Sequence, residues 1–236
     1  MASDVPHVSF LGFEAVLSAL DSESLGVSPA DRSSWVSVDR SGRTRARRTL
    51  LVDADAAART IVVEVASTGQ LDDQMVQEAV LVTEPEAPFS LREWTLESAV
   101  LDRYRQLRPQ TRMVAGGRVR RGRIRWDGVM RPEPEVGRRP VCVPWTWALL
   151  AEHDAGLQVA PTRVVHVLDG LCSFCRAVRW QACGKVIWRA QELRGFRVFG
   201  PSLSVRHLWV GPGGAVLFEL GVDQATVRQS LWEGRR

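Results

Sequence analysis

The chain has 236 residues, of which 45% are hydrophobic and 25% are charged. It is therefore long enough for a sizeable core and too apolar to be disordered throughout, which excludes collagen-like, low-complexity and miniature disulfide-stabilised classes. Because 31 basic residues face 27 acidic ones, the net charge of +4 does not by itself indicate a polyanionic partner.

The N-terminal segment carries Asp4 and Glu14 and lacks the basic region and cleavage site of a signal peptide. The longest strongly apolar run, residues 141–151, contains Pro144 and is about half the roughly 20 residues that a membrane-spanning helix needs. The cysteine spacing is unlike the framework of a secreted protein. We therefore expect a cytoplasmic protein with no membrane partner.

Residues 1–130 are predicted to form a β-rich region of unknown role. Apolar residues at helical spacing predict a helix over 8–20, and β-branched runs separated by turn residues predict a three-stranded antiparallel meander over 35–67. A fourth strand is expected at 77–84. Ser90 and Glu93 form a capping box, and the apolar residues after it recur with a period near 3.6, which predicts a long helix over 91–107.

An arginine-rich segment follows this helix. Alternation in an extended strand would place its side chains on two faces, with Arg121, Arg123 and Arg125 on one and Ile124 and Trp126 on the other. Guanidinium groups at this spacing could follow a phosphate backbone, with Trp126 as a stacking surface. The alternative is a half-buried strand with a solvated face. The candidate binding residues are Arg118, Arg120, Arg121, Arg123, Arg125 and Trp126.

The segment 131–160 is predicted to be a linker followed by a helix. Its first part, 131–140, contains three prolines and several charges, and its second part places Pro144 in the first turn of a helix and Gly156 past its end. The domain organisation is therefore 1–130, 131–160 and 161–236.

The third segment contains the one pattern that indicates chemistry. A β-branched run over 163–168 ends at Asp169, and Cys172 and Cys175 follow at a CxxC spacing. No glycine or proline occurs again before Gly184, which favours a helix that begins at the cysteines. Unpaired N–H groups at a helix start stabilise a thiolate, so Cys172 would be nucleophilic and Cys175, one turn later, could resolve a mixed disulfide.

The stretch LDGLCSFCRAVRW resembles the signature of the DCC family of thiol-disulfide oxidoreductase-like proteins. Asp169, Gly170, Cys172 and Cys175 match in place, and the later Val-Arg-aromatic run matches with one residue fewer before it. The match is confined to this stretch. It implies a thioredoxin-like fold, with Cys172 as the attacking thiol, Cys175 as the resolving thiol and Asp169 as an orienting or proton-handling group.

The rest of the C-terminal segment agrees only in part with a thioredoxin-like order. Further strands are expected at 186–189, 204–210 and 215–220, with a closing helix over 223–232. Two departures stand out: no proline directly precedes the strand at 204–210, where thioredoxin-like domains place a cis-proline, and the crossover at 190–203 is short for a helix.

Other roles for the cysteines stay open. They could be buried as small apolar residues, or Cys172, Cys175 and Cys183 could bind zinc together with Cys142 or a histidine (His153, His166 or His207). A structural zinc site usually shows a second closely spaced ligand pair, which is absent here, so no metal is expected. A cysteine paired with His207 as a hydrolase dyad has no local signature.

These patterns predict an α+β protein, in which an antiparallel β-rich region with a long helix precedes a thioredoxin-like α/β unit. The expected function is dithiol-disulfide exchange by Cys172 and Cys175 on a protein thiol or disulfide, without a cofactor. The alternative is a non-enzymatic interaction protein that binds a protein or nucleic acid through the arginine-rich strand.

Overall fold

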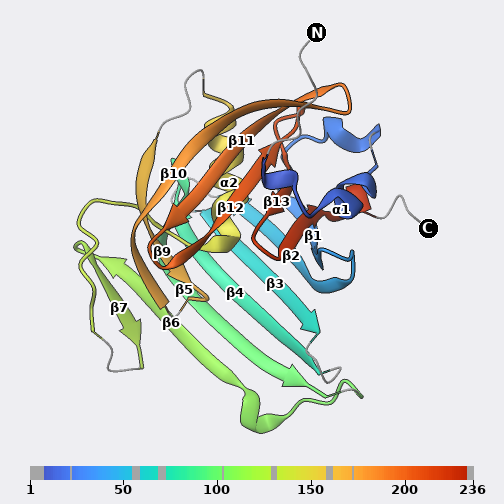
Figure 1. Cartoon of the computed structure of the whole chain (residues 1–236). Coiled ribbons are helices and arrows are strands. Elements are labelled where there is room, and N and C mark those ends of the chain that lie inside the picture. The colour runs from blue at the N-terminus through green and yellow to red at the C-terminus, as the bar shows by residue number, and fades with distance from the viewer. Residues whose placement is uncertain are drawn as a thin grey trace.

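The structure is a computed structural model that describes residues 8–21, 23–54, 59–68, 73–102, 104–128, 132–157, 162–171 and 173–232. Its strands form one 14-stranded sheet (Figure 1). The first seven are β1 (Arg32–Asp39), β2 (Thr44–Ala54), β3 (Arg59–Thr68), β4 (Gln74–Glu84), β5 (Ala87–Leu101), β6 (Met113–Arg120) and β7 (Arg123–Asp127). The last seven are β8 (Val141–Cys142), β9 (Arg163–Asp169), β10 (Ser173–Trp188), β11 (Gln191–Gly200), β12 (Leu203–Val210), β13 (Val216–Leu220) and β14 (Gln224–Arg228).

Helices are few and short. The α-helices are α1 (Glu14–Ser18), α2 (Trp147–Ala155) and α3 (Gln229–Trp232). The 3-10 turns are η1 (Val8–Phe10), η2 (Glu23–Gly26), η3 (Pro109–Thr111) and η4 (Pro144–Thr146). No helix among the described residues is long and apolar enough to cross a membrane.

The sheet consists of two successive meanders. Strands β1 to β7 each lie beside the one before, and so do β8 to β14, while the antiparallel pair β1 and β14 joins the two series in the middle of the sheet. Within the described residues, neighbouring strands are antiparallel except β8 and β9, which pair in parallel. Strands from before residue 131 and from after residue 160 thus belong to the same sheet.

The sheet curls around α2, which lies in the centre of the molecule (Figure 1). The helix contacts β5 from the first meander and β12 and β13 from the second, and β5 also contacts β8. The concave face therefore encloses the larger core, which includes Trp94, Trp147 and Trp180, each no more than 1% exposed. Burial of such large apolar surfaces dominates the stability of the fold.

A second core lies on the opposite face of the sheet. The N-terminal segment packs Phe10, Phe13 and Leu17 against outward-facing residues of the central strands, among them Phe218 and Val227. Because residues of β13 and β14 are buried on both faces, both faces of the sheet are covered at this point. The helix predicted over 8–20 is thus confirmed in part, as η1 and α1.

The predictions of an α+β class and of a long helix over 91–107 are wrong. These residues form most of β5, which pairs with β4 and β6. Trp94, Leu96 and Ser98 face the concave side, and exposed Thr95 and Glu97 face the other. The alternation was obscured because apolar residues occupy both faces at the end of β5, where Ala99, Val100 and Leu101 follow one another and so also fit a helical period.

The prediction of a thioredoxin-like unit over 161–236 is also wrong. From Ser173 onward the expected helix is replaced by β10, which pairs with β9 and β11. The short crossover over 190–203 is largely the strand β11. Half of the expected closing helix over 223–232 is β14, and only α3 is helical. Ladder pairing on both edges of β10 overrides its local compatibility with a helix.

Other predicted elements are confirmed. The meander over 35–67 corresponds to β1, β2 and β3, the strand at 77–84 to β4, and the strand at 204–210 to β12. The helix after the linker is η4 followed by α2, with Pro144 in the first turn and Gly156 at its end.

Candidate functional site

The concave face contains a pocket at one end, between the two meanders. We call it the inner pocket; its volume is about 270 Å³. The first meander contributes side chains of β1 to β4, the second contributes side chains of β12 to β14, and the β9–β10 turn and the residues before α2 form the remaining wall. A concave site to which separate elements contribute a few polar groups is the usual form of a small-molecule site.

Strand alternation explains why polar groups point into this pocket. Leu50 belongs to the concave core, so Arg48, two residues earlier on β2, faces the same side. Ser37 on β1 and Thr226 on β14 are cross-strand neighbours, and their hydroxyl oxygens are 2.9 Å apart. Both side chains line the pocket, together with Gln77 of β4.

The second meander supplies an ion pair. Nη1 of Arg206 on β12 donates to Oε1 of Glu219 on β13 at 2.7 Å, and the guanidinium lies over the ring of Trp147 at 5.7 Å. The charge of Glu219 is the main reason why the pKa of Arg206 is raised. Both residues line the inner pocket, so this charged pair is available to orient a polar group there.

Arg48 faces the pocket from the opposite wall. Its guanidinium lies over the ring of Trp35 at 5.5 Å, and its Nε is buried without a hydrogen-bond partner among the described residues. Burial lowers the pKa of Arg48, while the charge of Glu219 opposes that shift. A buried guanidinium N–H without an acceptor is costly, because such groups are normally hydrogen-bonded in a folded protein.

Apolar side chains complete the walls. Val65 of β3, Val143 and Trp145 before α2, and Leu168 and Leu171 beside the β9–β10 turn all line the inner pocket. The pocket therefore combines charged and hydroxyl groups with an apolar wall, which suits a ligand that has one polar end.

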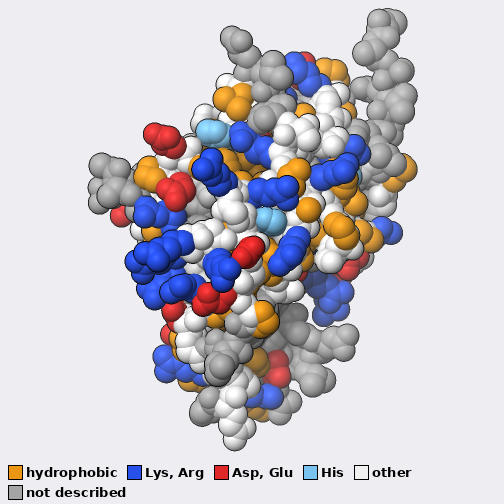
Figure 2. All heavy atoms as spheres, turned by 90° about the vertical axis from the view of Figure 1, so that its left-hand side faces the viewer, with side chains coloured by type: hydrophobic (Ala, Val, Ile, Leu, Met, Phe, Trp, Pro, Cys, Tyr) orange, Lys and Arg blue, Asp and Glu red, His pale blue; other side chains and the backbone are white. Residues whose placement is uncertain are grey.

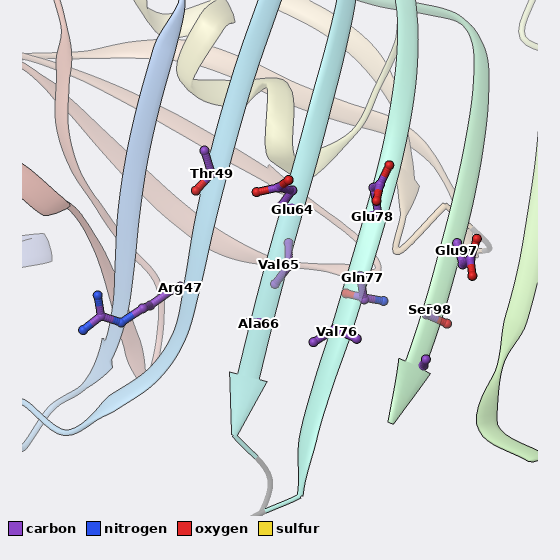
Figure 3. A pocket seen from close by; sticks show the side chains of 11 residues that line it. Arg47, Thr49, Glu64, Val65, Ala66, Val76, Gln77, Glu78, Glu97 and Ser98 are labelled. Carbon is purple, nitrogen blue, oxygen red and sulfur yellow. The ribbon is translucent and has the colours of Figure 1, made fainter. Parts of the chain in front are cut away.

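A larger hollow of about 390 Å³ lies on the outer face of β2 to β5. Figure 3 shows Glu64, Glu78 and Glu97 on three adjacent strands, and the register places them directly beside one another. These carboxylates are exposed, and Glu97 forms an ion pair with Arg112 at 2.7 Å. An exposed acidic row of this kind is also what a solvated sheet face looks like, so it identifies no ligand.

The predicted cysteine site is only partly described. Cys172 lies outside the described residues, and Asp169 is exposed at the end of β9, where it lines the inner pocket. Cys175 is 6% exposed on β10, and its Sγ donates to the carbonyl oxygen of Ser202 at 3.9 Å. Burial, and to a lesser extent Asp169, raises the pKa of this thiol. Cys175, predicted to lie one turn into a helix as the resolving thiol, therefore lies on a strand with a disfavoured thiolate.

The other described cysteines, Cys142 and Cys183, do not complete the predicted cysteine site. Cys142 is buried in the concave core, whereas Cys183 packs against the outer core, and burial raises their pKa values to about 12 and about 11. The described residues contain no cluster of three or more His, Cys, Asp or Glu side chains suited to a metal. His166 is also committed within the fold, because its Nδ1 accepts from the backbone N of Ala177 at 3.4 Å.

The arginine-rich segment forms a hairpin rather than one strand. Arg118 and Arg120 on β6 are the cross-strand neighbours of Arg125 and Arg123 on β7, so these four share the outer face, and Arg121 occupies the turn with φ 51°. Trp126 faces the concave side, where its ring meets Trp94 at 5.7 Å and its Nε1 donates to the carbonyl of Pro132 at 3.1 Å. Trp126 is therefore not a stacking surface beside these arginines.

Sequence reasoning missed the polar residues of the inner pocket. One of them had a recognisable signal: Arg48 interrupts the apolar face of a predicted strand, since it alternates with Leu50 and Val52. Arg206 and Glu219 gave no comparable signal, because they meet only through the pairing of β12 with β13.

Comparison with known proteins gives a fold likeness only. No family model and no curated protein matches the chain. A beta-barrel-like protein of the domain of unknown function DUF1849 from Brucella abortus is similar in structure, with a TM-score of 0.52 and 7% identity over 84% of this chain and 94% of that chain. A DUF1089 family protein from Pseudomonas aeruginosa gives a TM-score of 0.48 and 11% identity over 74% of this chain and 89% of that chain.

The resemblance to the DCC family is overturned by the structure and by the first neighbour. That neighbour is beta-barrel-like, in agreement with the nearly all-β structure of this chain, which has no thioredoxin-like arrangement among its described residues. Of the short motif, Asp169 and Cys175 lie on the paired strands β9 and β10, and Cys172 lies outside the described residues. Descriptions as a thioredoxin-like oxidoreductase with a redox-active centre are not supported.

Proposed function

We propose that the chain is a non-catalytic binding protein that holds a small amphiphilic molecule in the inner pocket. The observation that supports this most directly is the composition of the pocket, in which polar groups from both meanders converge beside an apolar wall. Its volume of about 270 Å³ lies just below the roughly 300–1,000 Å³ of ordinary ligand pockets, which fits a small or partly protruding ligand.

The test uses four single-chain amphiphiles that share a decyl chain and differ in the head group: decanoate, decyl phosphate, decanol and decyltrimethylammonium. Each is titrated below the concentration at which it forms micelles, and binding is measured by calorimetry and by the thermal midpoint, since a ligand that binds only the folded state raises that midpoint. We expect saturable binding of at least one. The absence of saturable binding for all four would overturn the proposal.

A matched pair of variants locates the site. Ala46 lines the inner pocket, whereas Ala66, on the neighbouring strand, lines the outer hollow. Ala46→Trp is expected to fill the inner pocket and abolish binding, while Ala66→Trp leaves it unchanged. The reverse result would move the ligand to the outer hollow and contradict the proposal.

A second candidate function is nucleic-acid binding through the outer face of the β6–β7 hairpin. Figure 2, which faces the side of the molecule carrying β7, β9 and β10, shows Lys and Arg side chains gathered there. Arg123 and Arg125 are partly neutralised by Glu135 at 2.6 Å and Glu133 at 3.8 Å. The test is a salt series with a single-stranded oligonucleotide, because genuine phosphate contacts weaken steeply with salt. Affinity that is independent of salt, or of Arg118→Gln, would exclude it.

The cytoplasmic location belongs to the same proposal. Cys142, Cys175 and Cys183 are free thiols, and free thiols persist in a reducing compartment. Dithiol-disulfide exchange with a protein substrate stays a prediction, because Cys172 is not described.

A further inference from the structure

The arginines of the concave side differ in whether they have a carboxylate partner. Three of them have a carboxylate partner: Arg163 with Asp154 at 2.8 Å, Arg206 with Glu219 at 2.7 Å and Arg228 with Glu152 at 3.0 Å. Arg48 has no ion-pair partner among the described residues, and its Nε is buried without an acceptor. The protein thus supplies a counter-charge for each of the three but holds the guanidinium of Arg48 open at the pocket.

The other charges at the pocket do not satisfy Arg48. Glu219 contributes a favourable field, but its carboxylate is hydrogen-bonded to Arg206. Asp169 lies at the far wall, where its charge acts on Arg206. An additional anion at Arg48 would therefore pair with a guanidinium whose desolvation cost is already present in the empty protein, and charge-assisted hydrogen bonds of this type are among the stronger ones.

A track of concave-face side chains leads away from this arginine, apolar at Val65 and Met113 and polar at Gln77 and Ser98 between them. The register aligns Arg48 with Val65, Gln77, Ser98 and finally Met113, one residue on each strand from β2 to β6. Across four strand spacings of about 4.8 Å, this row measures roughly 19 Å. In the next row Met75 lies beside Val100.

The far end of the track is open to solvent. Met75 is 41% and Met113 is 49% exposed, although both face the same side as the concave core. Figure 1 shows the ends of β3 to β6 extending beyond the strands of the second meander, which leaves this part of the concave face uncovered. Methionine side chains adapt readily to flexible apolar ligands, and they are common at surfaces of this kind.

We propose that the ligand of the inner pocket is a single-chain anionic amphiphile, whose carboxylate or phosphate pairs with Arg48 and whose alkyl chain lies over Val65, Met75 and Met113. This inference rests on the proposed binding function and specifies its ligand class. The charge of Arg48 favours the anionic head group, and the exposed methionines provide an apolar surface where the alkyl chain would extend.

The test compares Arg48→Gln with Arg59→Gln. Arg59 also has a buried Nε without an acceptor among the described residues, but the cavity that it lines contains the carboxylates of Asp31 and Glu152. We expect Arg48→Gln to weaken binding of decanoate and decyl phosphate by about tenfold or more and that of decanol by less than about twofold. Arg59→Gln should change none of them by more than about twofold.

The outcomes separate this inference from the proposed function. Binding of decanol as tight as that of both anions, with no effect of Arg48→Gln, would overturn the anionic ligand and leave the binding function intact. The absence of any binding would overturn both. If decyl phosphate binds more tightly than decanoate, the head group is a phosphate monoester; the reverse order identifies a carboxylate.

A stability measurement distinguishes a ligand anchor from a structural arginine. Removing an unsatisfied buried charge relieves a desolvation cost, so Arg48→Met is expected to raise the thermal midpoint of the ligand-free protein while abolishing the preference for anions. A lowered midpoint would show that Arg48 mainly supports the fold.

A variant at the far end of the track tests where the alkyl chain lies. Met113→Gln should weaken the binding of decanoate but leave the binding of acetate unaffected. Equal effects on the two ligands would exclude the track.

Discussion

At the scale of single residues, Cys172 decides whether any thiol chemistry exists. Dithiol-disulfide exchange would require that the wild-type chain accelerate reduction of insulin disulfides by dithiothreitol and that Cys172→Ser abolish this effect, whereas the non-catalytic protein that we propose gives no acceleration. Cys142→Ser is the control, because Cys142 is fully buried and its pKa is raised to about 12 by burial. Equal rates for the wild type and both variants would exclude dithiol-disulfide exchange.

The two cysteines and Arg48 show what single residues reveal in a sequence. The CxxC spacing was conspicuous, but its chemistry depended on a helix that pairing with β9 and β11 does not allow. Arg48 was inconspicuous, yet an arginine on the apolar face of a correctly predicted strand is the signal that leads to the inner pocket. Its unsatisfied Nε became visible only with the surrounding structure in place.

At the scale of elements, the β1–β2 turn depends on the carboxylate of Asp39. This carboxylate accepts hydrogen bonds from the backbone N of Ser41 and of Arg43, both at 3.0 Å, and from the Ser41 hydroxyl at 2.6 Å. Its other oxygen accepts from Nη2 of Arg45 at 2.8 Å. The Ser41 hydroxyl is the largest of the causes that lower the pKa of Asp39 from 3.8 to about 2.

A pH dependence follows from this lowered pKa. The ionised form is favoured in the folded state, so its contribution is present above pH 3.8 and is lost as the pH falls towards about 2. Asp39→Asn cannot ionise and is expected to reduce the pH dependence of the urea midpoint between these values. Asp53→Asn, at an exposed position of β2, is the control. If the urea midpoint changes with pH equally in Asp39→Asn and in the wild type, this carboxylate does not have the proposed role.

Elements with local signals were the ones that could be predicted. The first three strands are joined by short turns and alternate clearly, and α2 has a proline at its start and a glycine at its end. The prediction for β5 failed because apolar residues occupy both of its faces near its end, and that for β10 failed because a bulge between Cys175 and Val178 disturbs the alternation. In both strands, cross-strand partners decide the structure.

At the scale of the whole molecule, the curl of the sheet depends on contacts that are remote in sequence. The central pair joins Trp35 of β1 to Arg228 of β14, and α2 is held between the two meanders. Meander connections could be predicted from turns, but nothing local indicates that β1 is the partner of β14. The inner pocket exists only because of this closure, so its location could not be derived before the fold was known.

The N-terminal segment is attached to this sheet through Arg189, in the turn between β10 and β11. Its Nη2 donates to the carbonyl oxygens of Leu17 and Ser18, both at 3.0 Å, and its Nη1 donates to that of Leu20. The carbonyls of Leu17 and Ser18 are at the C-terminal end of α1 and that of Leu20 follows it, so the cation lies at the negative end of the helix and adds partners for these acceptors where helical ones are few. The segment in turn covers Phe218 and Val227 of the outer core.

Arg189→Ala is therefore expected to loosen the N-terminal segment. Loss of charge-assisted hydrogen bonds should lower the free energy of unfolding by about 1–3 kcal/mol, and limited proteolysis should cleave before Gly26 faster than in the wild type. Arg179→Ala, at an exposed position of β10, is the matched control and should change neither quantity. Arg189→Lys keeps the charge but cannot reach all three carbonyls, so an intermediate cleavage rate is expected. If Arg189→Ala unfolds and is cleaved like Arg179→Ala, the segment is held by its apolar contacts alone.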